Sequence, residues 1–182
     1  MKNLAYAFII VTFLLLGYYI FPTMSLLLFV WFGIFSIIRV RKLDKKLNRN
    51  EKTLFFMTVF AYPLLESIIK FFIIRNIIPY SWNFLNRIEH FLSAIGIGIL
   101  FYPIFKPTLD KLGRFESFLF LVFTIVFIGN LNEFFEYVLR IQMDLHYKFS
   151  IYYWDTIYDM FINIIGAIFG SLIVSFVRKV PD

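Results

Sequence analysis

The stretch "YYWDTIYDMFINIIGAIFG", residues 152–170, places two aspartates one helical turn apart at the start of a long apolar run. Asp155 and Asp159 lie at its beginning, and the run continues to Val177. Since about 20 helical residues cross a hydrocarbon core of roughly 30 Å, this run predicts a transmembrane helix. Its carboxylates would lie near one membrane surface.

The composition of the whole chain agrees with a membrane protein. Of 182 residues, 60% are hydrophobic, 22% are aromatic and only 16% are charged, which is too little polar surface for a soluble globule. The net charge of +6 lies mostly in short segments between apolar runs, so it does not indicate nucleic-acid binding. The absence of cysteine excludes disulfides and thiolate metal sites.

Apolar runs of spanning length recur along the chain and predict an all-α, polytopic bundle of six transmembrane helices. Pro22 separates the first two runs, which are together too long for one span, so we expect a tight helical hairpin there. We expect one transmembrane domain over residues 1–182, with spans at about 4–20, 23–38, 53–74, 84–105, 115–139 and 156–177.

Basic residues set the expected orientation. The segment "RVRKLDKKLNRNEK", residues 39–52, carries seven basic and two acidic residues, so the positive-inside rule makes it cytoplasmic. Alternation then places both termini in the cytoplasm, and it places Lys106, Lys111, Arg114 and Arg178 on the same side. Aromatic residues near Tyr80 and Tyr147 fit the outer interface. We therefore expect a multi-pass protein of the cell membrane.

Ionisable residues gather at one depth, in the outer half of the membrane and within about 12 Å of its surface. Such groups are costly when they face lipid, so we expect them to face one another. The third to sixth spans contribute Glu66, Lys70, Arg87, His90, Glu133, Glu136, Asp155 and Asp159.

Helical spacing places these groups on shared faces. Glu133 and Glu136 lie three residues apart, while Asp155, Asp159 and Asn163 follow one another at intervals of four. Further along the same face, Gly166 and Gly170 predict close packing against a neighbouring helix. Asn163 is expected to make a hydrogen bond between helices.

Several of these residues carry a family resemblance. Asn86-Arg87 with His90-Phe91, the glutamates of "NEFFEY" (residues 132–137), and then Asp159, Asn163, Gly166 and Gly170 resemble the pattern of VanZ-like membrane proteins. Trp154-Asp155, Asp159-Met160 and Gly166-Ala167 resemble the YjdF-type inner-membrane family. The resemblance covers the last three spans and departs at Asn86, where those families tend to have an acid. It implies a small multi-helix membrane protein, without an agreed molecular activity.

The donor set suits a divalent cation such as Zn²⁺, Mn²⁺, Mg²⁺ or Ca²⁺, because it combines carboxylate oxygens with one imidazole. We expect His90, Glu133 and Asp159 to be the metal ligands, with Glu136 or Asp155 as a base beside them. Bundle proteins build carboxylate metal sites from this spacing on facing helices. A bound metal would act on a phosphoryl or acyl oxygen of a lipid or another amphiphilic envelope substrate.

Paired charges are the alternative interpretation of the same residues. Glu133 with Arg87, Glu66 with Lys70 and Asp155 with Arg140 could each form an ion pair that holds the helices together. Because acids outnumber bases in the layer, pairing alone leaves surplus carboxylate, which favours a metal or protons.

Three function classes therefore remain at this point. They are a metal-assisted enzyme, a non-catalytic envelope binding or accessory protein of the VanZ kind, and a small transporter. The inner halves of the last three spans lack ionisable groups, which disfavours the transporter.

Overall fold

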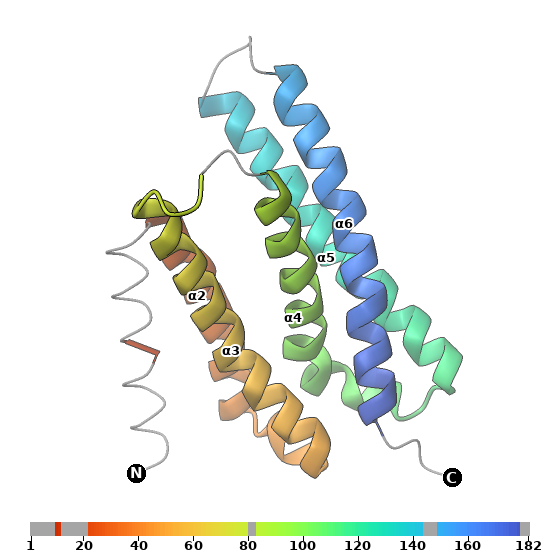
Figure 1. Ribbon diagram of the computed structural model, residues 1–182. Helices are drawn as coiled ribbons and strands as arrows, with labels where there is room; N and C mark the ends of the chain where they lie inside the picture. Colours follow the sequence, from red (N-terminus) through yellow and green to blue (C-terminus); the bar gives the residue numbers. More distant parts are fainter. Residues whose placement is uncertain (1–9, 12–21, 80–82, 144–148, 179–182) are drawn as a thin grey trace. The chain divides into compact units, whose positions relative to one another are not determined.

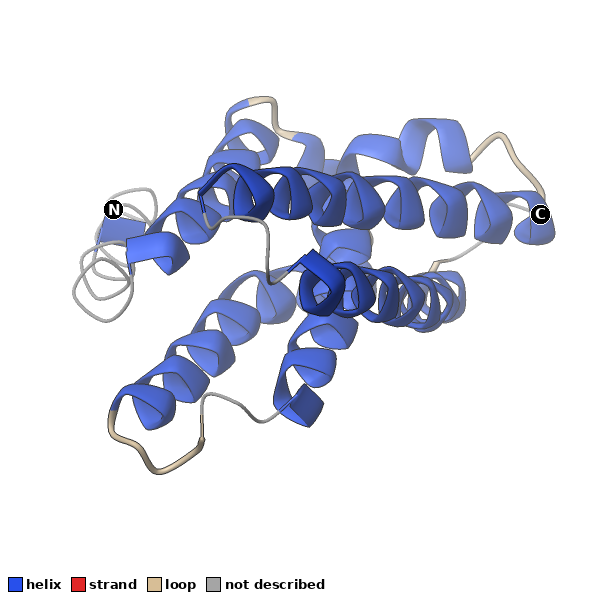
Figure 2. Ribbon diagram, turned by 90° about the horizontal axis from the view of Figure 1, so that it is seen from above, coloured by secondary structure: helices blue, strands red, loops and turns tan. Residues whose placement is uncertain are grey.

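The computed structural model describes residues 10–11, 22–79, 83–143 and 149–178 (Figure 1). Every element of regular structure within these residues is helical (Figure 2). The chain divides into two compact units, Met1–Trp82 and Asn83–Asp182, which are described separately below.

Each helix covers one of the predicted spans and extends beyond it by up to two turns. The predicted span at 4–20 lies outside the described residues, apart from Ile10 and Val11. The helices are α2 (Pro22–Val40), α3 (Arg49–Ile74), α4 (Asn83–Leu109), α5 (Arg114–Met143) and α6 (Phe149–Val177), with a short 3₁₀ helix η1 (Leu43–Lys46).

Hydropathy and length confirm a multi-pass membrane protein. Four segments are long and apolar enough to cross a membrane: Arg49–Ile73, Phe84–Leu109, Arg114–Phe135 and Tyr153–Val177. In α2, residues Leu28–Val40 form an apolar segment. The count of six spans and the cytoplasmic placement of both termini stay predictions. Of the expected outer aromatic residues, Tyr80 and Tyr147 lie outside the described part of the chain.

In the first unit, α2 and α3 are joined by a hydrogen bond at a proline. Pro63 lies inside α3 and has no N–H to donate to the carbonyl of Val59, four residues earlier. The Trp31 indole N–H of α2 donates to that carbonyl at 3.1 Å. Trp31 also packs on Tyr62, with ring centroids 4.7 Å apart. A backbone acceptor that would otherwise face an apolar interior is thereby satisfied.

Local signals fix both ends of α3. At the start, Asn48 and Glu51 form a reciprocal capping box, in which each side chain accepts from the other residue's backbone N–H. At the end, Asn76 has a φ of 55°, and the N–H groups of Asn76 and Ile77 donate to Ile73 and Phe72. This is a Schellman motif, which stops the helix.

In the second unit, α6 packs against both α4 and α5 (Figure 1). The contact with α4 depends on glycine: a Cβ at Gly166 would lie 2.7 Å from the Phe91 carbonyl oxygen and 2.7 Å from the Ala94 Cβ. A Cβ at Gly170 would lie 3.1 Å from the Ile95 Cα. The predicted packing role of Gly166 and Gly170 is confirmed, since only glycine allows so close an approach.

Candidate functional site

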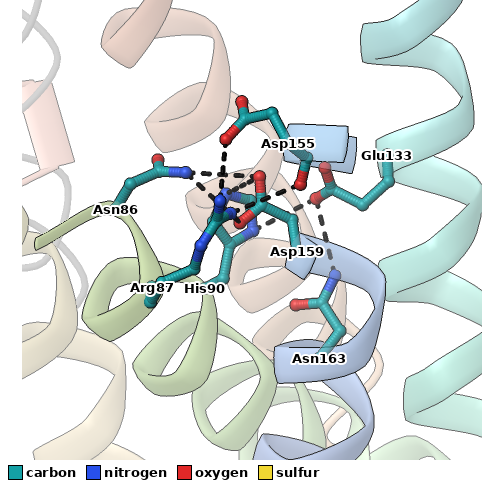
Figure 3. Close-up of polar contacts among 7 residues, drawn as sticks. All are labelled: Asn86, Arg87, His90, Glu133, Asp155, Asp159 and Asn163. Atoms are coloured by element: carbon teal, nitrogen blue, oxygen red, sulfur yellow. Dashed lines mark hydrogen bonds and ion pairs between the residues drawn. The ribbon is translucent and has the colours of Figure 1, made fainter. Parts of the chain in front are cut away.

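Three helices bring His90, Glu133 and Asp159 together at one place in the second unit (Figure 3). His90 Nδ1 lies 3.1 Å from Glu133 Oε1, and His90 Nε2 lies 3.5 Å from Asp159 Oδ2. One donor atom from each residue lies within 4.8 Å of the other two. The imidazole of α4 therefore lies between a carboxylate of α5 and a carboxylate of α6.

Two further residues of α4 hold the aspartates of α6. The Arg87 guanidinium pairs with Asp159 and also reaches Asp155, with Nη2 3.0 Å from Oδ1. The Asn86 amide donates to both carboxylate oxygens of Asp159 at 3.2 Å. Asp159 is thus shared by three side chains from a little more than one turn of α4, Asn86, Arg87 and His90 (Figure 3).

Asn163, one turn after Asp159 on α6, contacts α5. Its amide lies 3.5 Å from Glu133 Oε1, which makes a weak hydrogen bond between the helices and confirms the expected role. A Cβ at Gly129 would lie 3.2 Å from the Asn163 amide carbon, so glycine leaves room for this side chain. Glu133 is consequently fixed from two sides, by His90 and by Asn163.

The cluster carries surplus negative charge. Glu133 and Asp159 are almost completely buried, at 2% and 1% exposure, while Asp155 is only partly covered. The acids Glu133, Asp155 and Asp159 face one guanidinium, so the cluster would have a charge of about −2 with all three acids ionised and His90 neutral. Buried carboxylates need compensation: a divalent cation would balance this charge, and a doubly protonated imidazole would balance half of it.

The structure brings together most of the residues expected in the polar layer: His90, Glu133, Asp155, Asp159, Arg87 and Asn163. The ion pairs differ from the expected pairing of Glu133 with Arg87. Arg87 contacts the two aspartates of α6, and Glu133 contacts His90 instead. α4 packs closely on α6 at the glycines, so the Arg87 side chain crosses to that helix.

Other expected members of the layer lie in the first unit or have side chains that are not described. Glu66 and Lys70 belong to the first unit and pair with each other at 3.5 Å, as the paired-charge alternative predicted. Whether they share the layer stays a prediction. The side chains of Glu136 and Arg140 lie outside the described residues.

Two contacts of the cluster involve residues that were not among the predicted site residues. Asn86 lies one turn before His90 on α4, and this spacing is the signal that identifies it. The Arg87 guanidinium also lies over the Tyr158 ring, 5.3 Å from its centroid. Tyr158 follows Trp154 by four residues, and their rings are 6.3 Å apart, so an aromatic edge adjoins the charged cluster.

Sequence comparison places the chain in a family of membrane proteins. Residues 1–180 match the family described as "Predicted membrane protein (DUF2238)". Comparison with curated proteins and with solved structures finds no match. Because the match covers nearly the whole chain, the chain belongs to this family.

Proposed function

We propose that this member of the DUF2238 family of predicted membrane proteins is a metal-assisted membrane enzyme that acts on a lipid or another amphiphilic envelope substrate. One observation carries the proposal: His90, Glu133 and Asp159, from three different helices, offer ligand atoms within 4.8 Å of one another. Residues that merely face away from lipid do not need to converge in this way.

The donor set fits a divalent cation. One imidazole nitrogen with two carboxylate oxygens suits Zn²⁺ or Mn²⁺ best, and Mg²⁺ or Ca²⁺ less well, because the latter two prefer oxygen ligands alone. Asn163 and Asn86 hydrogen-bond to Glu133 and Asp159, which is how outer residues orient metal ligands. A bound cation would polarise a phosphoryl or acyl oxygen of the substrate.

Two carboxylates are candidates for the base. Asp155 is held by Arg87, has a side chain 26% exposed and lies at the edge of the cluster, where it would accept a proton from water. Glu136 follows Glu133 by three residues on α5 and is proposed as the other candidate from that spacing.

The expected topology supports a substrate that enters from outside. Basic residues gather in the segment before α3 and around the α4–α5 connection, which favours a cytoplasmic location for both. The cluster would then lie in the outer half of the cell membrane, where envelope lipids are accessible. The resemblance of residues 86–170 to VanZ-like and YjdF-type proteins supports an envelope role.

A non-catalytic envelope binding protein is the second candidate, and a specific contact pattern favours it. Arg87 pairs with Asp155 and Asp159, and His90 lies between Asp159 and Glu133, so every carboxylate of the cluster contacts a basic side chain. If His90 is doubly protonated and one of the three carboxyl groups keeps its proton, the cluster is a neutral ion-pair network that needs no metal.

Elemental analysis of the detergent-purified protein tests the metal site. The wild type should contain close to one equivalent of Zn or Mn, and the Glu133→Gln/Asp159→Asn variant should lose it while keeping its helical circular dichroism. Glu116→Ala is the matched control, because Glu116 is an exposed acid at the start of α5. Equal metal content in the wild type and the double variant would reject the metal site.

A second measurement separates the enzyme from the binding protein. Metal-loaded and chelator-treated protein would each be incubated with vesicles of polar membrane lipids, followed by mass spectrometry of the lipids. A product that needs both the metal and Asp155 supports the enzyme. Metal binding with no product would support the binding protein instead.

A further inference from the structure

The loop between α2 and α3 turns its acids inward and its bases outward. Asp44 is 1% exposed and pairs with Arg39, and Glu51 is 2% exposed and belongs to the capping box with Asn48. No other acid occurs in residues 39–52. Both acidic side chains of this segment are therefore buried and held by contacts within the segment itself.

The remaining bases of this loop are exposed. Leu47 is buried and anchors the loop, so the basic side chains around it extend outward. We call these six exposed residues the basic surface: Arg41, Lys42, Lys45, Lys46, Arg49 and Lys52. Their charge is not offset by any exposed acid of the same loop.

The loop between α4 and α5 makes a useful contrast. It exposes Lys111 and Arg114, but it also exposes the acids Asp110 and Glu116. Its outward charge is therefore mixed. Both loops join two apolar helices, yet only the basic surface presents charge of a single sign.

Exposed apolar side chains adjoin the basic surface on both helices. At the end of α2, Ile37 and Val40 are exposed by 57% and 79%, directly before Arg41. On α3, Met57 is exposed by 65%, just over one turn after Lys52. Exposed apolar side chains are thus followed directly by cations, the order expected where a spanning helix passes from acyl chains to phospholipid headgroups.

We propose that the basic surface binds the headgroups of anionic phospholipids in the membrane that the chain spans. The loop between two spanning helices is short, so its cations should lie close to that membrane surface, where charges interact over a Debye length of about 8 Å at physiological salt. A membrane lipid fits better than nucleic acid or an acidic protein because the surface borders exposed apolar side chains directly. The proposal is independent of the His90 cluster and of which side of the membrane the loop faces.

Lipid retention tests the proposal. The protein would be purified from mixed micelles with equal phosphatidylglycerol and phosphatidylcholine, and the retained lipids measured by mass spectrometry. We expect the wild type to enrich phosphatidylglycerol. Lys42→Gln/Lys45→Gln/Lys46→Gln should reduce this enrichment at least about tenfold, because each cation near an anionic surface contributes separately.

Matched variants make the result specific. Arg75→Gln/Lys111→Gln/Arg114→Gln removes the same number of exposed charges elsewhere and should keep the enrichment. Lys42→Arg/Lys45→Arg/Lys46→Arg keeps the positive charge and should also keep the enrichment. This variant distinguishes loss of charge from a general effect of substitution on folding. An equal loss in both glutamine variants, or displacement of phosphatidylglycerol by a short DNA duplex at lower concentration, would overturn the proposal.

Discussion

Trp31 supplies the hydrogen bond that Pro63 removes from α3. The proline has no N–H for the Val59 carbonyl, and the Trp31 indole donates to that carbonyl from α2 at 3.1 Å. The pairing links two helices through the backbone of one of them. It also explains how a proline is tolerated in the middle of an apolar helix.

Trp31→Phe should therefore lower the stability of the protein in detergent by about 1–2 kcal/mol, because an interhelical hydrogen bond is lost. In a Pro63→Ala background, Trp31→Phe should lower the free energy of unfolding by less, since the alanine at residue 63 has its own N–H to donate to the Val59 carbonyl. A double-mutant cycle with unfolding followed by circular dichroism measures this coupling. Strictly additive effects would mean that the indole does not replace the missing donor.

Gly166→Ala should destabilise the contact between α4 and α6. The added Cβ would lie 2.7 Å from the Phe91 carbonyl oxygen, which belongs to backbone, so the helices must move apart at a cost of about 1–3 kcal/mol. Gly33→Ala is the control, because nothing lies within 4 Å of a Cβ at that position. The control should be neutral or slightly stabilising, and thermal unfolding of both variants checks the difference.

Arg87→Gln should make the metal-free protein less stable, by about 3–5 kcal/mol, because Asp155 and Asp159 lose their cation in a mostly buried site. Adding Asp155→Asn should restore part of this loss.

The same Arg87→Gln change should raise the affinity for Zn²⁺ roughly tenfold, because Arg87 competes with a metal for Asp159. Calorimetric titration measures the second effect, and weaker Zn²⁺ binding would contradict it.

Asn76→Gly should leave the stability unchanged or raise it slightly, whereas Asn76→Val should lower it by about 1–2 kcal/mol. The reason is the left-handed backbone at residue 76, with a φ of 55°, which glycine adopts freely and a β-branched residue resists. Thermal unfolding in detergent compares the two variants. Equal midpoints would show that the end of α3 unfolds without affecting the rest of the first unit.

Length and hydropathy were sufficient to locate the helices, because a membrane imposes one minimum length on every span. They did not locate the ends. α6 begins at Phe149 rather than near residue 156, because exposed Tyr153 and Trp154 continue the helix beyond its most apolar part. α3 begins at Arg49, where the capping box of Asn48 and Glu51 starts it.

Residue spacing also predicted the candidate site, since ionisable groups at one depth avoid lipid by facing one another. It correctly grouped His90, Glu133 and Asp159. It could not assign Arg87 to its partners, because that depends on how closely α4 approaches α6. The approach is set by Gly166 and Gly170, which contact Phe91 and Ile95, about one and two turns after Arg87 on α4.

The narrow seam at Gly166 and Gly170 has a mechanical consequence. Phe91 and Ile95 meet α6 there through backbone atoms, which cannot rotate aside as side chains do. The two helices therefore cannot separate at this seam by a change of side-chain rotamer, and any opening there requires one helix to move as a whole.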